Sequence, residues 1–440
     1  MLSPINNYRY SLHKATSSNQ NRQITEIMAR KKTILLVSIL FYSLLALPTL
    51  AREKFQSLIV RPNDIALKEK IRIDRVLINT GITSFKKSKS SRFLVPVDKK
   101  LGSRRQIRKL MKTGVFKYVE PNHIINLDEK NYVSVEKTLY NENYYTSYNN
   151  LSTNDTEFNN QPDLSQIKAT KAWNLSTGNE DIIVAVIDSG INATHTELSG
   201  KVFGRPGHES YDLTDVLALG HGTAVSGIIA AKTNNLQGIA SVGRNAKILS
   251  IRVFNSGGKT DTDTIASALE DAYENGARIA QISASTPSYS KTLSEAVELA
   301  QERGILIVST AGNTSTNESE LKYPGAFPGV LCVGSVDSNN NHASHSVTGA
   351  HVNLVAPGVN IKVLQNGGGY REATGTSFAS PMISGIAVLL LGINPNLTNE
   401  ELRSILILSA DDLGESGKDS IFGFGIVDAL KAALMAEETL

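Results

Sequence analysis

The sequence predicts an α/β protein with a doubly wound, mostly parallel sheet that carries helices on both faces, and a small α+β module in front of it. Over residues 161–440, short runs of β-branched and aliphatic residues alternate with longer segments of helical periodicity. The strand segments are almost continuously apolar, which is typical of parallel strands covered on both faces. A composition of 41% hydrophobic and 20% charged residues allows a large core.

The elements of the sheet region follow from the positions of apolar runs and glycines. Gly276 and Gly304 end two helical segments. Chemistry in such sheets gathers at the carboxyl ends of the strands. We expect strands at 181–187, 248–254, 277–283 and 305–309, and helices at 223–231, 261–275 and 293–300.

Residues 52–130 are expected to form the small module, and residues 131–160, rich in Asn, Tyr, Ser and Thr, an accessible linker. The module carries 20 Lys or Arg against 8 Asp or Glu, whereas residues 131–440 carry 19 against 33. Such a basic block can bind nucleic acid, an acidic membrane or the acidic remainder of its own chain. Within it we expect strands at 58–60, 93–97 and 116–121, the last at a sheet edge, and a basic helix at 104–111.

Residues 1–51 are interpreted as an N-terminal extension with a signal peptide at about 30–51. Arg30-Lys31-Lys32 precedes an uncharged run that ends near Ala51, which is the pattern of a secretory signal. Since the 18 uncharged residues also reach the lower limit for crossing a bilayer, an uncleaved anchor is the alternative. Met28 would begin a normal signal, so the true start is Met1 or Met28. We expect an exported protein, whether secreted, periplasmic or envelope-associated.

The single cysteine, Cys332, excludes internal disulfides and multi-cysteine metal sites. We interpret it as a small core residue of a buried strand.

Four polar residues stand where an acyl-transfer site would need them. Ser377 precedes an apolar helical run, and Pro381 is expected in that helix's first turn, where no hydrogen bond is lost. A serine nucleophile needs a base, which His221 supplies, and Asp188 after a strand can fix the imidazole tautomer. Asn313 can offer its amide to an oxyanion. Taken alone, Ser377 can be a helix cap, His221 a capping or buried histidine, and the other two residues turn residues. The prediction therefore depends on the occurrence of all four motifs in this order along the chain.

These segments resemble the subtilisin-like serine endopeptidases over about residues 161–440. In subtilisin the residues of the catalytic triad follow one another along the chain in the order Asp, His, Ser, which this sequence shares. The matching motifs are Val184 to Ile191, Gly220 to Val225, Ala311-Gly312-Asn313 and Gly375 to Pro381.

The resemblance implies hydrolysis of protein or peptide substrates through an acyl-enzyme, with no cofactor required for the chemistry. Ser377 would attack, His221 would move the proton, Asp188 would orient His221, and Asn313 with the Ser377 N–H would hold the oxyanion. The rival interpretation, a noncatalytic peptide-binding protein, would require a lost triad residue, and none is lost.

The resemblance also implies that the basic module is a propeptide, which acts as an intramolecular inhibitor and chaperone. Tyr118-Val119-Glu120-Pro121-Asn122 is similar to the end of such a propeptide, and its opposite charge suits an internal complex. Maturation is then expected in the 131–160 linker. Nucleic-acid binding is not expected, because interleaved aromatic residues and known motifs are missing. We expect a monomer.

Ser283, Ala284, Ser285 and Gly312 are the candidate substrate-binding residues. Ser285 and Thr286 replace glycines that are usual in the family, and Thr310 stands where alanine is common. The specificity pocket is therefore expected to be narrower or more polar than usual.

Structural calcium is left open by the sequence. Lys232 to Gly238 aligns with a family calcium loop, in which Asn235 is a candidate ligand. An Asn-Asn turn is equally typical of a turn alone, so no metal residue is predicted.

Overall fold

The computed structural model describes residues 55–98, 101–126, 148–314 and 321–440. The predicted N-terminal extension and signal peptide at 1–51, and residues 131–147 of the predicted linker, lie outside the described residues.

A seven-stranded sheet forms the centre of the larger part of the chain, and every strand pair in it is parallel. The predicted α/β class is confirmed. From β6, the chain adds β8 on one side and β10 on the other, so the strand order reverses beside β6. In sheet order the strands are β13 (Leu354–Pro357), β12 (Leu331–Val336), β11 (Leu306–Thr310), β10 (Ile279–Ile282), β6 (Ile183–Asp188), β8 (Lys247–Arg252) and β7 (Val202–Gly204).

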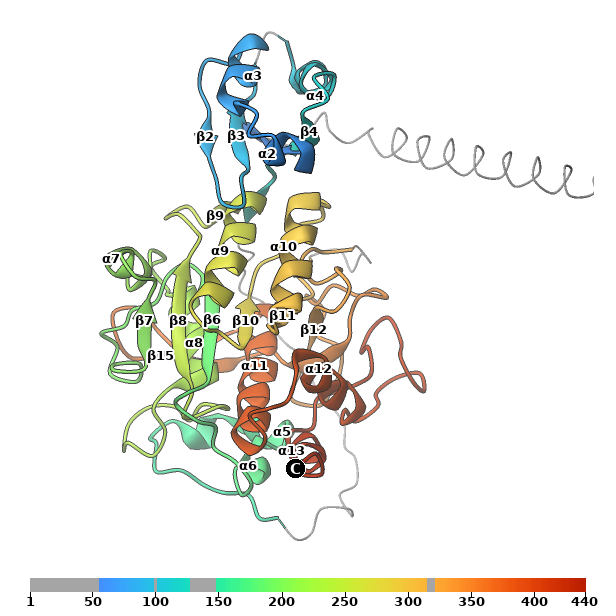
Figure 1. Cartoon of the computed structure of the whole chain (residues 1–440). Coiled ribbons are helices and arrows are strands. Elements are labelled where there is room, and N and C mark those ends of the chain that lie inside the picture. The colour runs from blue at the N-terminus through green and yellow to red at the C-terminus, as the bar shows by residue number, and fades with distance from the viewer. Residues whose placement is uncertain (1–54, 99–100, 127–147, 315–320) are drawn as a thin grey trace, which may run out of the picture. The chain divides into compact units, whose positions relative to one another are not determined.

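Helices cover both faces of this sheet because its strands are apolar on both faces. Val184 and Val186 belong to the apolar cluster that includes residues of α8 and α11. Ala185 and Ile187, which alternate with them, belong to the cluster of α9 and α10. Figure 1 shows α9 and α10 side by side over the sheet. The four helices are α8 (His221–Ala230), α9 (Thr262–Glu274), α10 (Lys291–Glu302) and α11 (Thr376–Ile393).

Helix α11 is buried along most of its length. Among the described residues it is the one helix long and apolar enough to cross a membrane, and 89% of its apolar window lies inside the protein. Burial of this kind identifies α11 as the core helix of the fold. The remaining elements of residues 148–440 are η1 (Phe158–Asn160), α5 (Pro162–Gln166), α6 (Ala169–Ala172), α7 (Glu209–Asp212), α12 (Asn399–Leu408), α13 (Ala429–Glu437) and the paired strands β14 (Ile361–Leu364) and β15 (Tyr370–Ala373).

Residues 55–126 build a separate antiparallel sheet with the order β2-β3-β1-β4, which places β4 at an edge. One apolar cluster, which includes Leu58, Leu77 and Leu110, lies beneath it. A last strand, β5 (Ile124–Asn126), pairs instead with β9 (Lys259–Asp261) just before α9. The other elements are β1 (Ser57–Pro62), α2 (Asp64–Lys68), α3 (Ile73–Asn79), β2 (Lys86–Lys87), β3 (Phe93–Pro96), α4 (Ser103–Met111) and β4 (Phe116–Pro121).

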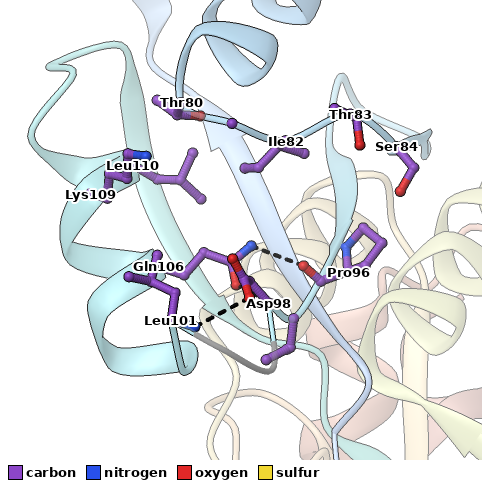
Figure 2. A pocket seen from close by; sticks show the side chains of 12 residues that line it. Thr80, Ile82, Thr83, Ser84, Pro96, Asp98, Leu101, Gln106, Lys109 and Leu110 are labelled. Carbon is purple, nitrogen blue, oxygen red and sulfur yellow. Dashed lines mark hydrogen bonds between the residues drawn. The ribbon is translucent and has the colours of Figure 1, made fainter.

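A cavity of about 260 Å³ opens in this N-terminal module beside α4 (Figure 2). The Gln106 carboxamide spans its floor: it donates to the Pro96 carbonyl at 2.9 Å and accepts from the Asp98 N–H at 2.8 Å. None of the predicted site residues lines this cavity, so it plays no part in the chemistry predicted from the sequence.

Candidate active site

Asp188 and His221 form a buried pair at the carboxyl edge of the sheet. Asp188 is the last residue of β6, and His221 is the first residue of α8. The His221 Nδ1 lies 2.8 Å from Asp188 Oδ1 and 3.0 Å from Oδ2, and each residue is 1% exposed. Gly222 permits this approach, because a Cβ there would lie 2.2 Å from the Gly190 carbonyl oxygen. The pair sits beside the point where the strand order reverses, which is where such sheets place their sites.

A second buried carboxylate, Asp215, holds the start of α8 and was not predicted. It accepts hydrogen bonds from the N–H and hydroxyl of Thr223 at 2.9 and 2.7 Å. It also accepts from the Ser189 hydroxyl at 2.9 Å, and that hydroxyl accepts the Gly222 N–H. Burial, together with the nearby Asp188 charge, raises the pKa of Asp215. Asp215 thus fixes both the turn after Asp188 and the helix that carries His221. No spacing rule points to it, since it lies in an irregular loop.

Ser377 occupies the second position of α11, whose N-cap is Gly375. It is 6% exposed, and its Oγ donates to the Ser283 carbonyl at 3.3 Å. The ring of Phe378, the next residue, packs against the His221 imidazole with centroids 5.6 Å apart. The start of α11 therefore lies beside the aspartate–histidine pair.

The expectation that Pro381 stands in the first turn of this helix is wrong. α11 begins at Thr376, so Pro381 is its sixth residue and lies within the helix. A proline there cannot donate to the carbonyl four residues earlier, which belongs to Ser377. The Ser283 hydroxyl donates to that carbonyl instead, at 3.3 Å. One wall of the predicted specificity pocket is thereby tied to the serine itself.

Asn313 is oriented by the first residue of α11. Its Oδ1 accepts from the Thr376 N–H at 3.0 Å and from the Thr376 hydroxyl at 2.9 Å. These two hydrogen bonds fix the carboxamide oxygen at the helix start. Its Nδ2 lies 3.3 Å from the place that a Cβ on Gly375 would take.

The four candidate substrate-binding residues lie together with Ser377 and Asn313. The ends of β10 and β11 supply the two walls of one small pocket, and the start of α11 closes it. The lining residues are Ser283, Ala284, Ser285, Thr310, Gly312, Asn313, Thr376 and Ser377.

The fold and this arrangement define a hydrolase of the serine peptidase class. Residues 179–425 match the model of the subtilase family, peptidase family S8. The chain belongs to this family and is a serine endopeptidase that acts on protein or peptide substrates.

Curated and structural relatives support the assignment. Subtilisin Savinase of Lederbergia lenta is 36% identical over 268 residues, which are 60% of this chain and 96% of that protein. The thermophilic serine proteinase of Bacillus sp. (strain AK1) is 33% identical over 325 residues, 72% of this chain and 75% of that protein.

Among solved structures, fervidolysin from Fervidobacterium pennivorans, a keratinolytic enzyme related to subtilisin, superposes with a TM-score of 0.72 at 25% identity. The match covers 87% of this chain and 61% of fervidolysin, so this chain spans about six tenths of that protein's length.

Proposed function

We propose that Asp188, His221 and Ser377 are the catalytic triad and that Asn313, with the Ser377 N–H, stabilises the oxyanion. The contact of His221 Nδ1 with both Asp188 oxygens supports this assignment most directly. A proton on Nδ1 directed at the carboxylate leaves Nε2 as the base for the serine hydroxyl. Ser377 then attacks the scissile carbonyl, and His221 returns the proton to the leaving amine. Removing the Asn313 amide is expected to cost about 2.7–4 kcal/mol of transition-state stabilisation.

The test is intact-mass analysis with a fluorophosphonate, which labels an activated serine. We expect one adduct, mapped to Ser377, and none on Ser377→Ala or on heat-denatured protein. A folded, propeptide-free protein that takes no adduct would contradict the proposed triad. So would a Ser377→Ala protein that cleaves peptides at the wild-type rate.

We further propose that residues 52–130 are a propeptide that covers the peptidase domain, residues 161–440. Its strand β5 pairs antiparallel with β9, and the Ile125 side chain is buried in the apolar cluster of α9 and α10. Main-chain pairing of an extended segment with an exposed strand is a common way to bind a peptide. The two strands form a sheet of their own, and we propose that substrates would pair with β9 in place of the propeptide.

Both helices of that face are contacted at their N-termini. The Glu120 carboxylate accepts from the N–H groups of Lys291 and Thr292 at 3.0 and 2.9 Å, at the start of α10. The Asn122 carboxamide oxygen accepts from the Asp263 N–H at 3.2 Å, at the start of α9. A carboxylate or amide oxygen satisfies the free donors of a helix start. These contacts are made by an acidic and an uncharged residue of the basic module, so they would add to the predicted charge complementarity and are not an instance of it.

Self-processing within the 131–160 linker is the expected maturation step. Wild-type protein should be recovered shortened within this linker, whereas Ser377→Ala should stay full length. A shortened Ser377→Ala protein would mean that another protease performs the cleavage. Size-exclusion chromatography with light scattering of the mature species should give one peptidase domain per particle, as a monomer requires.

We propose export directed by residues 30–51, beginning at Met1 or Met28. The sequence similarity to subtilisins is compatible with export of this protein. Release of a mature species without detergent would support a cleaved signal. Retention of the activity in the membrane fraction would favour the uncleaved anchor.

We also propose a structural calcium beside the loop that the sequence singled out. Asn235 donates its N–H to Asp155 at 3.1 Å and its side-chain amide to Glu197 at 3.4 Å. Glu197 is 0% exposed, and its Oε2 has no hydrogen-bond partner within the described part of the chain. Burial is the main cause of the raised pKa of Glu197, and the Asp155 charge adds to it. A buried carboxylate oxygen without a donor suits a hard cation.

Asp155 and Glu197 would hold this ion, which would act on stability alone, since subtilases need no cofactor for the chemistry. The described residues contain no cluster of three or more His, Cys, Asp or Glu side chains, so main-chain oxygens would have to complete the shell. EGTA should lower the melting temperature of wild-type protein and should leave that of Glu197→Gln unchanged. The exposed control Glu302→Gln should respond like wild type.

A further inference from the structure

The pocket beside Ser377 is almost filled by the protein's own side chains. It retains about 10 Å³, whereas a single water molecule requires at least about 10–15 Å³. In a serine peptidase, the side chain of the residue whose carbonyl is attacked, the P1 residue, enters the space next to the nucleophile and the oxyanion donor. Here that space lies between the ends of β10 and β11.

Two side chains lie against one lining residue, Gly312: Ser285, which itself lines the pocket, and Lys322, which is not one of the lining residues. Gly312 has a bare α-carbon, and a Cβ built on it would lie 2.7 Å from the Ser285 Oγ and 3.2 Å from the Lys322 Cγ. Ser285 and the aliphatic stem of Lys322 therefore both lie against the face of Gly312. Sequence reasoning identified Ser285 as a departure from the family, but it did not identify Lys322, which directly precedes Tyr323 and lies between the motifs.

The walls of the pocket are held in place by hydrogen bonds. The Thr310 hydroxyl bonds to the Thr376 hydroxyl and accepts the Gly312 N–H at 3.3 Å. On the other wall, Gln281 donates to Ser283 at 2.9 Å and to Ser380 at 2.7 Å.

The segments that carry the two filling side chains are also joined to each other. Thr286 and Tyr323 exchange main-chain hydrogen bonds of 2.9 and 2.8 Å. The backbones next to Ser285 and Lys322 therefore cannot separate without breaking a pair of buried bonds. A large P1 side chain would have to displace Ser285 or Lys322, and overpacking of this kind is unfavourable.

We propose that Ser285 and Lys322 determine the specificity of this peptidase and restrict P1 to glycine, alanine or serine. The inference rests on the proposed role of Ser377 as the nucleophile. It narrows the substrate class from peptides in general to peptides with a small residue before the scissile bond.

The test is a set of tetrapeptide p-nitroanilides that differ only in P1, namely Ala, Asp, Leu and Phe. We expect kcat/KM for Ala to exceed that for Phe by about 10–200-fold or more. Ser285→Gly and Lys322→Gly should each raise the ratio of kcat/KM for Phe to kcat/KM for Ala at least about tenfold. Ser288→Gly, in the same loop but outside the pocket, is the matched control and should behave like wild type.

Equal rates on Ala and Phe in the wild type would overturn the proposal. A preference for Asp would also overturn it, since the Lys322 ammonium rather than the volume would then select P1. Fluorophosphonate labelling of the same preparation separates this failure from that of the triad. A labelled enzyme that prefers Phe refutes the specificity alone, whereas an unlabelled protein that cleaves none of the peptides refutes both.

Discussion

Buried carboxylates are satisfied differently at the contact between the N-terminal module and α9 than at Asp215 and Asp163 inside the peptidase domain. At the contact, Arg92 pairs with Asp263 and Glu270 at 2.7 Å each, and all three side chains are about 5% exposed. Inside the domain, Asp215 relies on hydroxyl and N–H donors, and Asp163 is buried with no side-chain partner among the described residues.

The difference fits the proposal that the propeptide is released after maturation, whereas the interior of the peptidase domain stays buried. If the propeptide leaves, Arg92 and the two carboxylates return to water, where each ion is well solvated without its partner. Asp215 stays inside the folded domain, so uncharged donors from neighbouring turns can satisfy it permanently. Ion pairs also occur inside the domain, where Lys168 pairs with the buried Asp428 and Arg205 with the buried Asp212. The difference therefore holds between these particular sites and not between the two regions as wholes.

Arg92→Met is expected to weaken propeptide binding more than any other single change at this contact. It leaves Asp263 and Glu270 buried without their cation, so we expect the propeptide to bind about 3–5 kcal/mol more weakly. That corresponds to an inhibition constant raised about 100-fold or more. Dilution of the purified, processed complex, followed by peptidase assay, measures it. Lys89→Met removes two ion pairs, with Asp271 and Glu274, of a lysine that is one-third exposed, and it should change the constant by less than about tenfold. Equal effects of the two variants would contradict the distinction.

Asp215→Ala tests the uncharged donors inside the domain. It leaves the Thr223 and Ser189 donors buried and unpaired, so we expect a loss of about 2–3 kcal/mol in stability. We also expect a lower kcat with KM nearly unchanged, because Asp215 acts on His221 only through its helix and turn. Asp215→Asn keeps one acceptor and should recover part of both. Denaturant unfolding in the Ser377→Ala background and peptide kinetics in the active protein measure the two effects. A variant with normal kcat and reduced stability would show that Asp215 has no positioning role.

Asp163→Asn is expected to stabilise the domain, and increasingly so as the pH rises. Burial raises the pKa of Asp163 to about 7, from about 3.9 in an unfolded chain. Between these values the folded state binds more protons, so wild-type stability falls as the pH rises through this window. The variant lacks this fall, and its advantage should reach about 1–2 kcal/mol above pH 7, since the asparagine amide is still buried. Calorimetry at pH 4.5 and pH 8 checks it, and an advantage independent of pH would contradict the assignment.

Glu120→Gln tests how much the carboxylate charge contributes to the contact with the start of α10. Glutamine keeps an acceptor for the Lys291 and Thr292 N–H groups but loses the charge that favours a helix N-terminus, so the expected effect is about 0.3–1 kcal/mol. The inhibition constant should rise by no more than about fivefold. Glu120→Ala, which removes the acceptor as well, should raise it further, and the reverse order would show that the hydrogen bonds are unimportant.

The sequence predicted the sheet region well because its signals are local. The apolar run that ends at Asp188 became β6, and the run after Gly375 became α11. Pro381 was misplaced because a proline inside a helix cannot be distinguished from one in its first turn until the first helical residue is known. In the module, the alternation at 116–121 correctly gave an edge strand, β4.

Residue identity and order by themselves determined the α/β class, the family resemblance and the residues that we propose as catalytic, because motifs, turns and helix starts are encoded within a few neighbouring residues. Only the tertiary structure showed that Arg92 meets Glu270 across 178 positions, that Asp215 supports α8, and that Lys322 reaches Gly312. Such contacts depend on how irregular loops fold back and on how separate segments pack, and neither periodicity nor spacing encodes which side chains are brought together in this way.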